Sequence, residues 1–315
     1  MKNVYRNFGL AILFLVSFGL FLYLSFPYGV LKEALASQIQ MTTGIRVRIE
    51  ELGPAIPLGF KATGVEILGA GGAKVSLSKV KASISILQIF LLNAGINIDI
   101  EANNKGYLEL GVGVPILSLF SGKDILPSYV DVEAKSFPLD GIVSYALKTV
   151  ANSESAAAVA GPMIAALGFK GNLDGTIKLN LDTAALPKST GQVALKINNA
   201  SLILSDPSIA LPDQVFKSAL VKADLSGGSF KIDPSSRFTA DELEFGADGK
   251  IGVKQNIGLS DMDLKIMVKL SGGLNEKLGW VMDGLSGGAS KGGLMNLQLA
   301  GSLAQPVVKG SQDAQ

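Results

Sequence analysis

The pattern Gly-x-Ser-x-Gly, read at Gly284-Leu285-Ser286-Gly287-Gly288, is the motif with the clearest link to catalysis. In hydrolases it places a nucleophilic serine on a sharp turn between a strand and a helix, beside a histidine that takes the serine proton. This chain contains no histidine, the residues before the motif are typical of a helix, and those after it are rich in glycine. We therefore interpret the segment as a linker.

A second candidate motif, Gly69 to Lys74, superficially resembles a phosphate-binding loop. Such a loop ends with Lys-Ser or Lys-Thr at the start of a helix, because the helix N-terminus and the backbone N–H groups hold the phosphate. Here Val75, Ser76 and Leu77 continue as a strand. The pattern favours a hairpin turn.

Two acidic pairs, Asp261 with Asp263 and Glu242 with Glu244, have the spacing that places both carboxylates on one face of a strand. Such pairs could bind a cation or form an acid–base dyad. Lysines alternate along the same rows, so we expect a solvated sheet face instead. Without histidine or cysteine the usual zinc and haem ligands are missing. We predict no metal, no cofactor and no enzymatic activity.

Composition limits the remaining functions. The chain has 315 residues, of which 48% are hydrophobic and 17% are charged, so it has enough apolar surface for a large core. Its 28 basic and 27 acidic residues are interspersed and give a net charge of +1. A nucleic-acid partner is excluded, because phosphate binding needs clustered lysine and arginine. No disulfide can form, since there is no cysteine.

An uncharged apolar run extends from Phe8 to Phe26. At ~1.5 Å rise per residue it is about long enough to cross a bilayer. Lys2 and Arg6 are the only charges before it, which predicts a cytoplasmic N-terminus and a body on the far side of the membrane. The alternative is a cleaved signal peptide, but the nearest cleavage pattern, Ala34-Leu35-Ala36, lies within a predicted helix. The anchor is the favoured interpretation.

The period of the apolar residues changes near Ile45, from about 3.6, typical of a helix, to 2, typical of strands. We expect a cytoplasmic tail and transmembrane anchor, a juxtamembrane helix, an N-terminal part of a β-sheet, a helical segment and a C-terminal part of the sheet. The expected boundaries are 1–27, 28–44, 45–138, 139–168 and 169–315. A further helix is predicted at 275–285, around Trp280.

Turn signals separate the predicted strands at intervals that suit antiparallel neighbours. They are Gly69 to Gly72, Asn103 to Gly106, Asp174-Gly175, Ser226 to Gly228 and Ala247 to Gly249. Helices are too few to connect so many parallel strands. The sequence therefore predicts a mainly β fold, a long antiparallel sheet with a few short helices.

Each clear strand has one apolar and one polar face. Such a face usually closes on a second layer, but here the helices are few, and an open, curved sheet could hold lipid acyl chains in a hydrophobic groove. The residues predicted to line it are Ile96, Ile98, Ile100, Ile177, Leu179, Leu181, Val193, Leu195, Ile197, Leu264, Ile266 and Val268.

The two ends of the sequence resemble a known superfamily. Residues 26–67, FPYGVLKEALASQIQMTTGIRVRIEELGPAIPLGFKATGVEI, are similar to the start of AsmA-like envelope proteins, including the step Thr63-Gly64-Val65. Residues 297–309, LQLAGSLAQPVVK, resemble the end of that superfamily, with Gly301, Leu303 and Pro306. Length, single anchor and central helical stretch most resemble the type II secretion system protein N family.

The resemblance implies a single-pass protein of the inner membrane of a Gram-negative-type cell, with a twisted, taco-like β-groove in the periplasm. It carries no catalytic motif to transfer. Larger relatives are linked to phospholipid movement, whereas the protein N family is associated with protein export. Two functions therefore stay open: binding or transfer of acyl lipid, and a structural role in the type II secretion machinery through protein contacts.

Overall fold

The computed structural model describes residues 13–14, 17–19, 21–43, 45–56, 58–68, 74–85, 88, 93–116, 127–151, 167–182, 185–204, 213–254, 256–285 and 292–309. The strands are β1 (Arg46–Ala55), β2 (Gly59–Leu68), β3 (Lys74–Ser85), β4 (Asn93–Ala102), β5 (Tyr107–Pro115), β6 (Tyr129–Pro138), β7 (Leu167–Asn180), β8 (Thr190–Leu204), β9 (Gln214–Val215), β10 (Ser218–Ser226), β11 (Ser229–Ile232), β12 (Arg237–Thr239), β13 (Leu243–Gly252), β14 (Asp261–Leu270), β15 (Leu294–Ser302) and β16 (Gln305–Lys309). The helices are α2 (Tyr28–Thr43), α5 (Asp140–Ala151) and α8 (Gly272–Leu285), with 3-10 turns η2 (Leu186–Lys188) and η3 (Ile257–Leu259).

Within the described residues, sixteen strands form one sheet in the order β1-β2-β3-β4-β5-β6-β7-β8-β10-β11-β13-β14-β15-β16. The short β9 pairs with β8, and β12 pairs with β10 and β13. Apart from these two short strands, each strand pairs with the strands that precede and follow it in the sequence. The pairs are antiparallel. The prediction of a mainly β, antiparallel sheet with a few short helices is confirmed.

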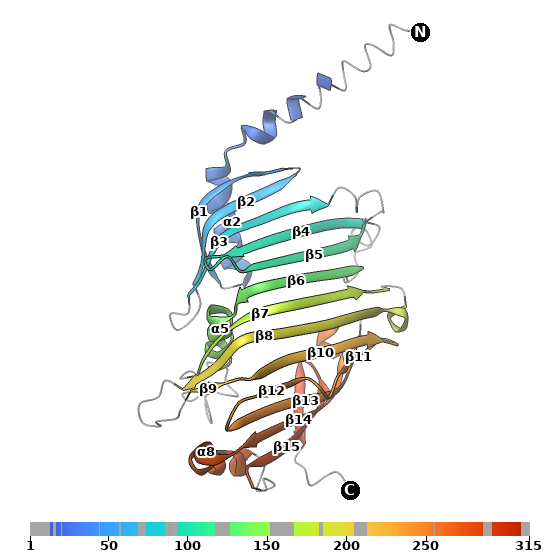
Figure 1. The fold of residues 1–315 in the computed structure, drawn as a ribbon. Coiled ribbons are helices and arrows are strands. Elements are labelled where there is room, and N and C mark those ends of the chain that lie inside the picture. The colour runs from blue at the N-terminus through green and yellow to red at the C-terminus, as the bar shows by residue number, and fades with distance from the viewer. Residues whose placement is uncertain are drawn as a thin grey trace.

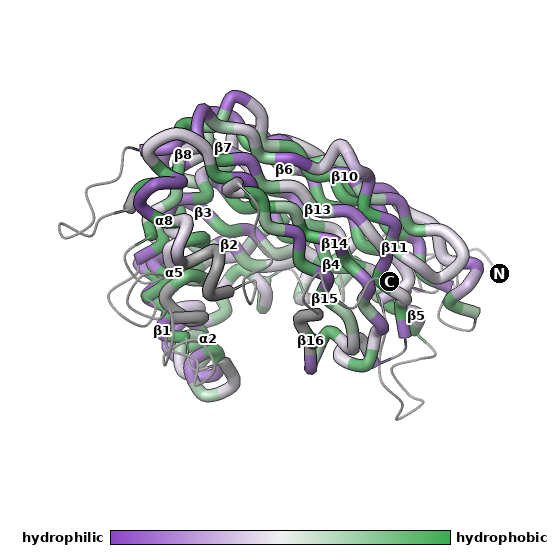
Figure 2. Tube along the Cα trace, turned by 90° about the horizontal axis from the view of Figure 1, so that it is seen from below, coloured by the Kyte–Doolittle hydropathy of each residue, from purple (hydrophilic) through white to green (hydrophobic). Residues whose placement is uncertain are grey.

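The sheet is strongly twisted and arched. Its strands run across the molecule in Figure 1, and α2, α5 and α8 all lie toward one end of the strands. Seen along the stack of strands, β6, β7 and β8 form the crown, while β1 with α2 and β16 lie below it (Figure 2). The helix α5 contacts both β3 and β7. One helix reaches two strands so far apart in the sheet because the sheet curves around it.

Extra residues in the strands contribute to this curvature. The register shifts between Leu77 and Lys79, between Ala134 and Phe137, and between Lys170 and Asn172. A bulge of this kind increases the local twist and bends the strand. Ser136 takes a left-handed backbone conformation, with φ of 47°. The shifts lie toward the same end of the strands as α5.

The N-terminal segment is helical at residues 13–14, 17–19 and 21–24, and the rest of the predicted anchor, residues 1–12, 15–16 and 20, lies outside the described residues. Among the helices that the structure describes, none is both long enough and apolar enough to cross a membrane. The predicted juxtamembrane helix, 28–44, corresponds to α2 and packs against β1.

Two predicted turns are wrong. Asp174-Gly175 lies inside β7 and Ala247-Asp248-Gly249 lies inside β13. Gly175 and Gly249 have φ of 141° and 134°, and a Cβ on either would lie about 2 Å from a carbonyl oxygen of the next strand. In these places the glycine permits a bend and a close approach between strands rather than a reversal of the chain.

The other predicted turns have different outcomes. Asn103 to Gly106 joins β4 to β5, and Gly227 and Gly228 join β10 to β11 with positive φ, as predicted. Residues 69–73 lie outside the described residues, although Leu68 pairs with Lys74 on either side of them. The predicted helix at 275–285 is confirmed within α8, and the helical segment 139–168 is described only as far as Ala151, and from Leu167 as part of β7.

Candidate functional site

An unbroken row of apolar residues crosses the whole sheet on one face. Each residue lies directly opposite the next one on the neighbouring strand. From β1 to β16 the row is Pro54, Phe60, Ala82, Ile98, Leu110, Val132, Ile177, Val193, Ala223, Ile232, Gly249, Leu264, Leu299 and Val308. We call it the central row. Cross-strand neighbours on one face are within side-chain contact, so the row is a continuous apolar strip.

A second row lies beside the central row on the same face. It consists of Ile84, Ile96, Val112, Val130, Leu179, Gly191, Leu225, Phe230, Ile251, Met262, Gly301 and Pro306. The residues between the two rows point to the opposite face, because side chains alternate along a strand. Together the rows define the apolar face.

The opposite, polar face carries the charged residues. One of its rows contains Asp131, Lys178, Gln192, Asp224, Lys231, Lys250 and Asp263 in direct register. Lys81 forms an ion pair with Asp99 at 3.6 Å on this face. Burial, followed by the charges of Asp99 and Glu109, raises the pKa of Tyr107 to about 12.

The twelve predicted groove residues are brought together by the sheet. Ile98, Ile177, Val193 and Leu264 belong to the central row, and Ile96 and Leu179 to the second row. The other predicted residues within the strands lie on the side of the central row away from the second row. They are Ile100 in β4, Leu195 and Ile197 in β8, and Ile266 and Val268 in β14. Leu181 lies just beyond the end of β7, where its N–H donates to Ser128.

The apolar face is only partly covered. None of the twelve residues is buried, and Ile96 is 51% exposed. The described strands all belong to one sheet, so no second sheet formed by these residues faces the apolar side. Most residues of the two rows are half-buried, and Ala223, Leu225 and Met262 are buried, so this chain covers the apolar face unevenly.

The sequence pattern does not predict several residues of the apolar face. They include Phe60, Ala82, Leu110, Val132, Ala223, Ile232 and Leu299. The alternation that marks them is present in β5 and β6, with Leu108, Leu110 and Val112 facing Ala134, Val132 and Val130. In β5 the positions that alternate with these apolar residues include Gly111 and Gly113 instead of polar residues. The alternation of polar and apolar side chains is therefore weak in this strand.

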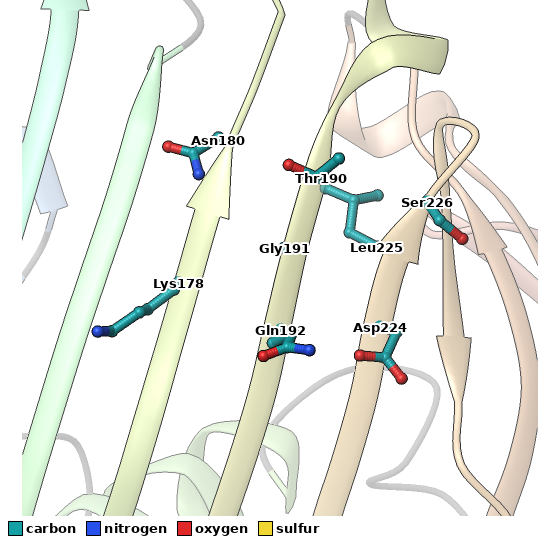
Figure 3. Close-up of a pocket in the computed structure, with 8 residues that line it drawn as sticks. All are labelled: Lys178, Asn180, Thr190, Gly191, Gln192, Asp224, Leu225 and Ser226. Atoms are coloured by element: carbon teal, nitrogen blue, oxygen red, sulfur yellow. The ribbon is translucent and has the colours of Figure 1, made fainter.

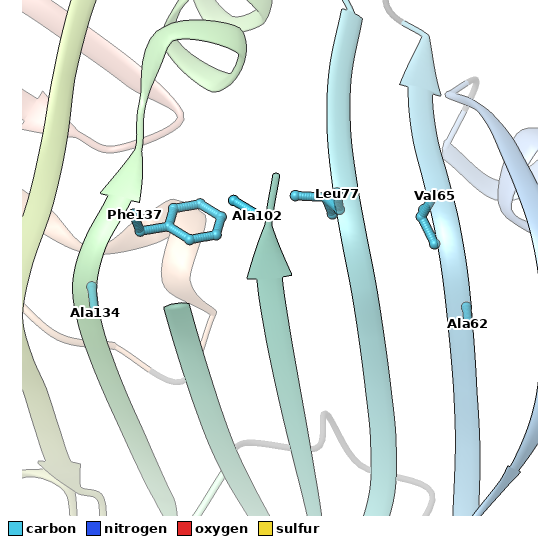
Figure 4. Packing of buried hydrophobic residues seen from close by; sticks show 6 residues of the cluster. All are labelled: Ala62, Val65, Leu77, Ala102, Ala134 and Phe137. Carbon is cyan, nitrogen blue, oxygen red and sulfur yellow. The ribbon is translucent and has the colours of Figure 1, made fainter. Parts of the chain in front are cut away.

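Toward the helix end of the strands, the same face becomes a closed core. Ala102 and Phe137 are 1% and 2% exposed, and they pack with Ala62, Val65, Leu77 and Ala134 (Figure 4). Near the other end of the chain, Leu274 of α8 packs against Leu270 and Met295. The helices therefore cover one side of the apolar face, whereas the other side includes exposed residues such as Ile84 and Ile96.

An apolar pocket of about 330 Å³ lies where the central and second rows begin. Its lining residues are Tyr23, Leu58, Gly59, Phe60, Ala82, Ser83, Ile84 and Ile96, none of them charged. We call it the N-terminal pocket. The Tyr23 hydroxyl accepts hydrogen bonds from the N–H groups of Ala55 and Gly59, both at 3.0 Å, and lies within donating distance of their carbonyl oxygens. The N-terminal segment is thereby fixed to the connection between β1 and β2.

A shallow polar depression of about 420 Å³ lies at the ends of β7, β8 and β10. Its lining residues include Lys178, Gln192 and Asp224, and Figure 3 shows Lys178 extending away from the other two. The polar groups do not converge on a common point. Nothing in this arrangement is specific for a ligand.

The acidic pairs do not form chemical sites. Asp261 forms an ion pair with Lys254 at 2.8 Å, and Asp263 accepts a hydrogen bond from Gln298 at 2.7 Å. The prediction that Glu242 shares a strand face with Glu244 is wrong. Glu242 precedes β13, and its carboxylate accepts hydrogen bonds from the N–H groups that begin α8. This is the role of a helix cap, favoured because those N–H groups have no partner within the helix.

In the part of the chain that the structure describes, no three acidic side chains lie close enough to hold a metal ion. Ser286 of the Gly-x-Ser-x-Gly pattern lies outside the described residues, and α8 continues to Leu285, immediately before it. The apolar face, with the N-terminal pocket at its start, is therefore the candidate functional site.

No protein-family model, no curated protein and no solved structure matches this chain.

Proposed function

We propose that this protein binds the acyl chains of lipids in a groove formed by the apolar face of its arched sheet, and that it does so as a membrane-anchored protein of the Gram-negative-type envelope. The observation that carries the proposal is the central row, which is apolar from β1 to β16 and includes no buried residue among the predicted groove positions. An apolar strip of this length that the chain covers only in part is costly in water, so a ligand that completes the cover is favoured.

The chemistry of the face suits acyl chains better than polar ligands. Burial of each CH₂ group contributes about 0.8 kcal/mol, so one chain of ordinary length could be held without any charged contact. Fourteen strands along the sheet, ~4.8 Å apart, give a strip about 60 Å long. Selectivity for the headgroup would be low, because the two rows of the apolar face contain no charged residue.

The proposed location depends on the apolar segment from Phe8 to Phe26 and on the resemblance to AsmA-like proteins and the type II secretion system protein N family. Lys2 and Arg6 would hold the N-terminus in the cytoplasm, and the sheet would lie in the periplasm. The same resemblance raises the alternative that the protein is a structural part of the secretion machinery. Strand addition at β16 is a weak basis for that role, since Pro306 has no N–H to donate.

Native mass spectrometry of the full chain, purified from membranes in detergent, tests the proposal. Val193→Lys places a charge in the central row, and Gln192→Lys places the same charge on the polar face at the next residue. We expect lipid adducts on the original protein and on Gln192→Lys, and about tenfold lower occupancy on Val193→Lys, because a buried unpaired charge opposes acyl binding. Circular dichroism shows whether both variants are folded.

The absence of lipid adducts on the unsubstituted protein would contradict the proposal. Equal lipid occupancy in Val193→Lys and Gln192→Lys would also contradict it. Constant co-purification with secretion components, together with lost protein export and unchanged membrane lipids on deletion, would favour the structural role instead.

A further inference from the structure

The N-terminal pocket lies at the junction between the predicted anchor and the apolar face. Phe60 and Ala82 of the central row and Ile84 and Ile96 of the second row line it, together with Tyr23 from the N-terminal segment. It is thus continuous with the strip that crosses the sheet. A ligand in the pocket would already contact the first residues of both rows.

The junction is held firmly. Besides the hydrogen bonds of Tyr23 to Ala55 and Gly59, the Tyr28 hydroxyl donates to the carbonyl oxygen of Tyr23 at 2.5 Å. The Tyr28 ring meets the rings of Tyr23 and Phe60 edge to face, at 6.3 and 6.2 Å between centroids. Tyrosines with engaged hydroxyls and apolar rings are typical of the interface between a bilayer and water.

Exposed apolar side chains continue outward from the pocket. Leu58, Phe60, Ile84 and Ile96 are between 40% and 51% exposed, and Ile56 on the neighbouring turn is 79% exposed. On the N-terminal segment, which projects away from the sheet beside β1 and β2, they continue with Phe18, Phe21, Leu22, Leu24 and Phe26 (Figure 1). Exposed apolar residues therefore lie both on the N-terminal segment around Tyr23 and on the strands that line the pocket with it.

We infer that phospholipid acyl chains pass between the bilayer and the groove through the N-terminal pocket. This inference rests on the proposed function and adds the place of uptake. Tyr23 fixes the pocket at the point where the apolar N-terminal segment leaves the membrane, so an acyl chain need not cross water to reach Ile84 and Ile96. The absence of charged residues among those that line the pocket suits the chain rather than the headgroup.

Site-specific photo-crosslinking in vesicles tests the inference. The full chain is reconstituted into vesicles of phosphatidylethanolamine and phosphatidylglycerol that contain a phospholipid labelled on its acyl chain. A benzoylphenylalanine is placed at Ile96 in the pocket, at Val193 in the central row, or at Asn97, whose side chain lies on the polar face. We expect labelled lipid at 96 and 193 and only background at 97.

Blocking the pocket gives the second measurement. With the crosslinker at 193, Ile96→Asp should slow the appearance of labelled lipid about tenfold, because the charge must be crossed by an apolar chain, and Asn97→Asp should leave it unchanged. Ile96 is half exposed, so Ile96→Asp should not disturb folding. If circular dichroism shows that Ile96→Asp is misfolded, Ile84→Asp replaces it.

The outcomes separate the two proposals. The uptake site is wrong if labelled lipid crosslinks at position 193 but not at position 96, or if crosslinking at 193 is equally fast in Ile96→Asp. Either result leaves the proposed function intact. Background labelling at both 96 and 193, or equal labelling at 97, contradicts the proposed function itself.

Discussion

Asp174 of β7 accepts a hydrogen bond from the backbone N–H of Ser136 in β6, at 2.8 Å. Ser136 is the residue of β6 with a left-handed backbone conformation. The other carboxylate oxygen of Asp174 accepts a hydrogen bond from the side chain of Asn198 in β8. One side chain thus joins three strands at the bend of the sheet. It satisfies an N–H that the register shift removes from the ladder.

Asp174→Ala should lower the free energy of unfolding by about 1–3 kcal/mol, because a backbone N–H and an amide lose a charged acceptor. Chemical unfolding of the full chain in detergent, followed by circular dichroism, measures this. Asp131→Ala, an exposed acidic residue on the polar face of β6, is the matched control and should change stability by less than about 0.5 kcal/mol. Equal effects would mean that the bend does not depend on Asp174.

Tyr23→Phe should loosen the attachment of the N-terminal segment. It leaves the N–H groups of Ala55 and Gly59 without their acceptor, so we expect a loss of about 1–3 kcal/mol and faster hydrogen exchange at both amides. Tyr28→Phe removes a single donated hydrogen bond and should have the smaller effect. Unchanged hydrogen exchange at the amides of Ala55 and Gly59 in Tyr23→Phe would show that the Tyr23 hydroxyl does not hold the N-terminal segment in place.

Gly249→Ala should be strongly destabilising. Its φ is 134°, and the added Cβ would lie 2.2 Å from the carbonyl oxygen of Asp263, so we expect a cost of at least about 2 kcal/mol. At Gly53 in β1 no atom lies within 4 Å of the added Cβ, and Gly53→Ala should be neutral or slightly stabilising. Thermal unfolding of the two variants decides the matter, and similar melting temperatures would be the contrary result.

Truncation of apolar residues should distinguish the closed core from the exposed face. Phe137 is 2% exposed, so Phe137→Ala should cost about 3–5 kcal/mol. Ile177 lies in the central row and is only half-buried, so Ile177→Ala should cost about 1 kcal/mol in lipid-free protein. Equal costs in urea unfolding would show that the apolar face is packed as tightly as the core, which would also contradict the groove.

The pH dependence should identify Tyr107. Its pKa is raised from 10.0 to about 12 in the folded state, so between these values the unfolded state loses the proton first. Stability from this group is therefore complete below about pH 10 and is lost as the pH rises toward 12. Tyr107→Phe should remove that part of the decline, and absorbance titration of tyrosinate provides an independent value. An unchanged decline in the variant would contradict the assignment.

The parts of the fold predicted from the sequence are those set by local period and local turn chemistry. The alternation at 96–101, 193–198 and 261–270 lies in strands as expected. The turn predicted at Asp174-Gly175 is wrong because the dipeptide that favours a turn also suits a bent strand. The difference is decided by the approach of the Ala194 carbonyl oxygen from the neighbouring strand, which the local sequence does not encode.

The sequence predicts which residues share the apolar face and an open, curved sheet that carries it, but not the register that aligns these residues across the strands. Period 2 indicates which side chains share a face, whereas the central row depends on the register of every strand pair. The N-terminal pocket joins Tyr23 to Ile96 across more than seventy residues, and no pattern in the sequence connects them. Both features arise from long-range pairing.

The strand order has a consequence for biogenesis. Nearly every strand pairs with the strand made just before it, so its hydrogen-bonding partner is already present when it emerges. Because contacts between neighbouring segments form faster than distant ones, the sheet can assemble progressively, strand by strand, from its N-terminal hairpin. The growing edge is then always the most recent strand.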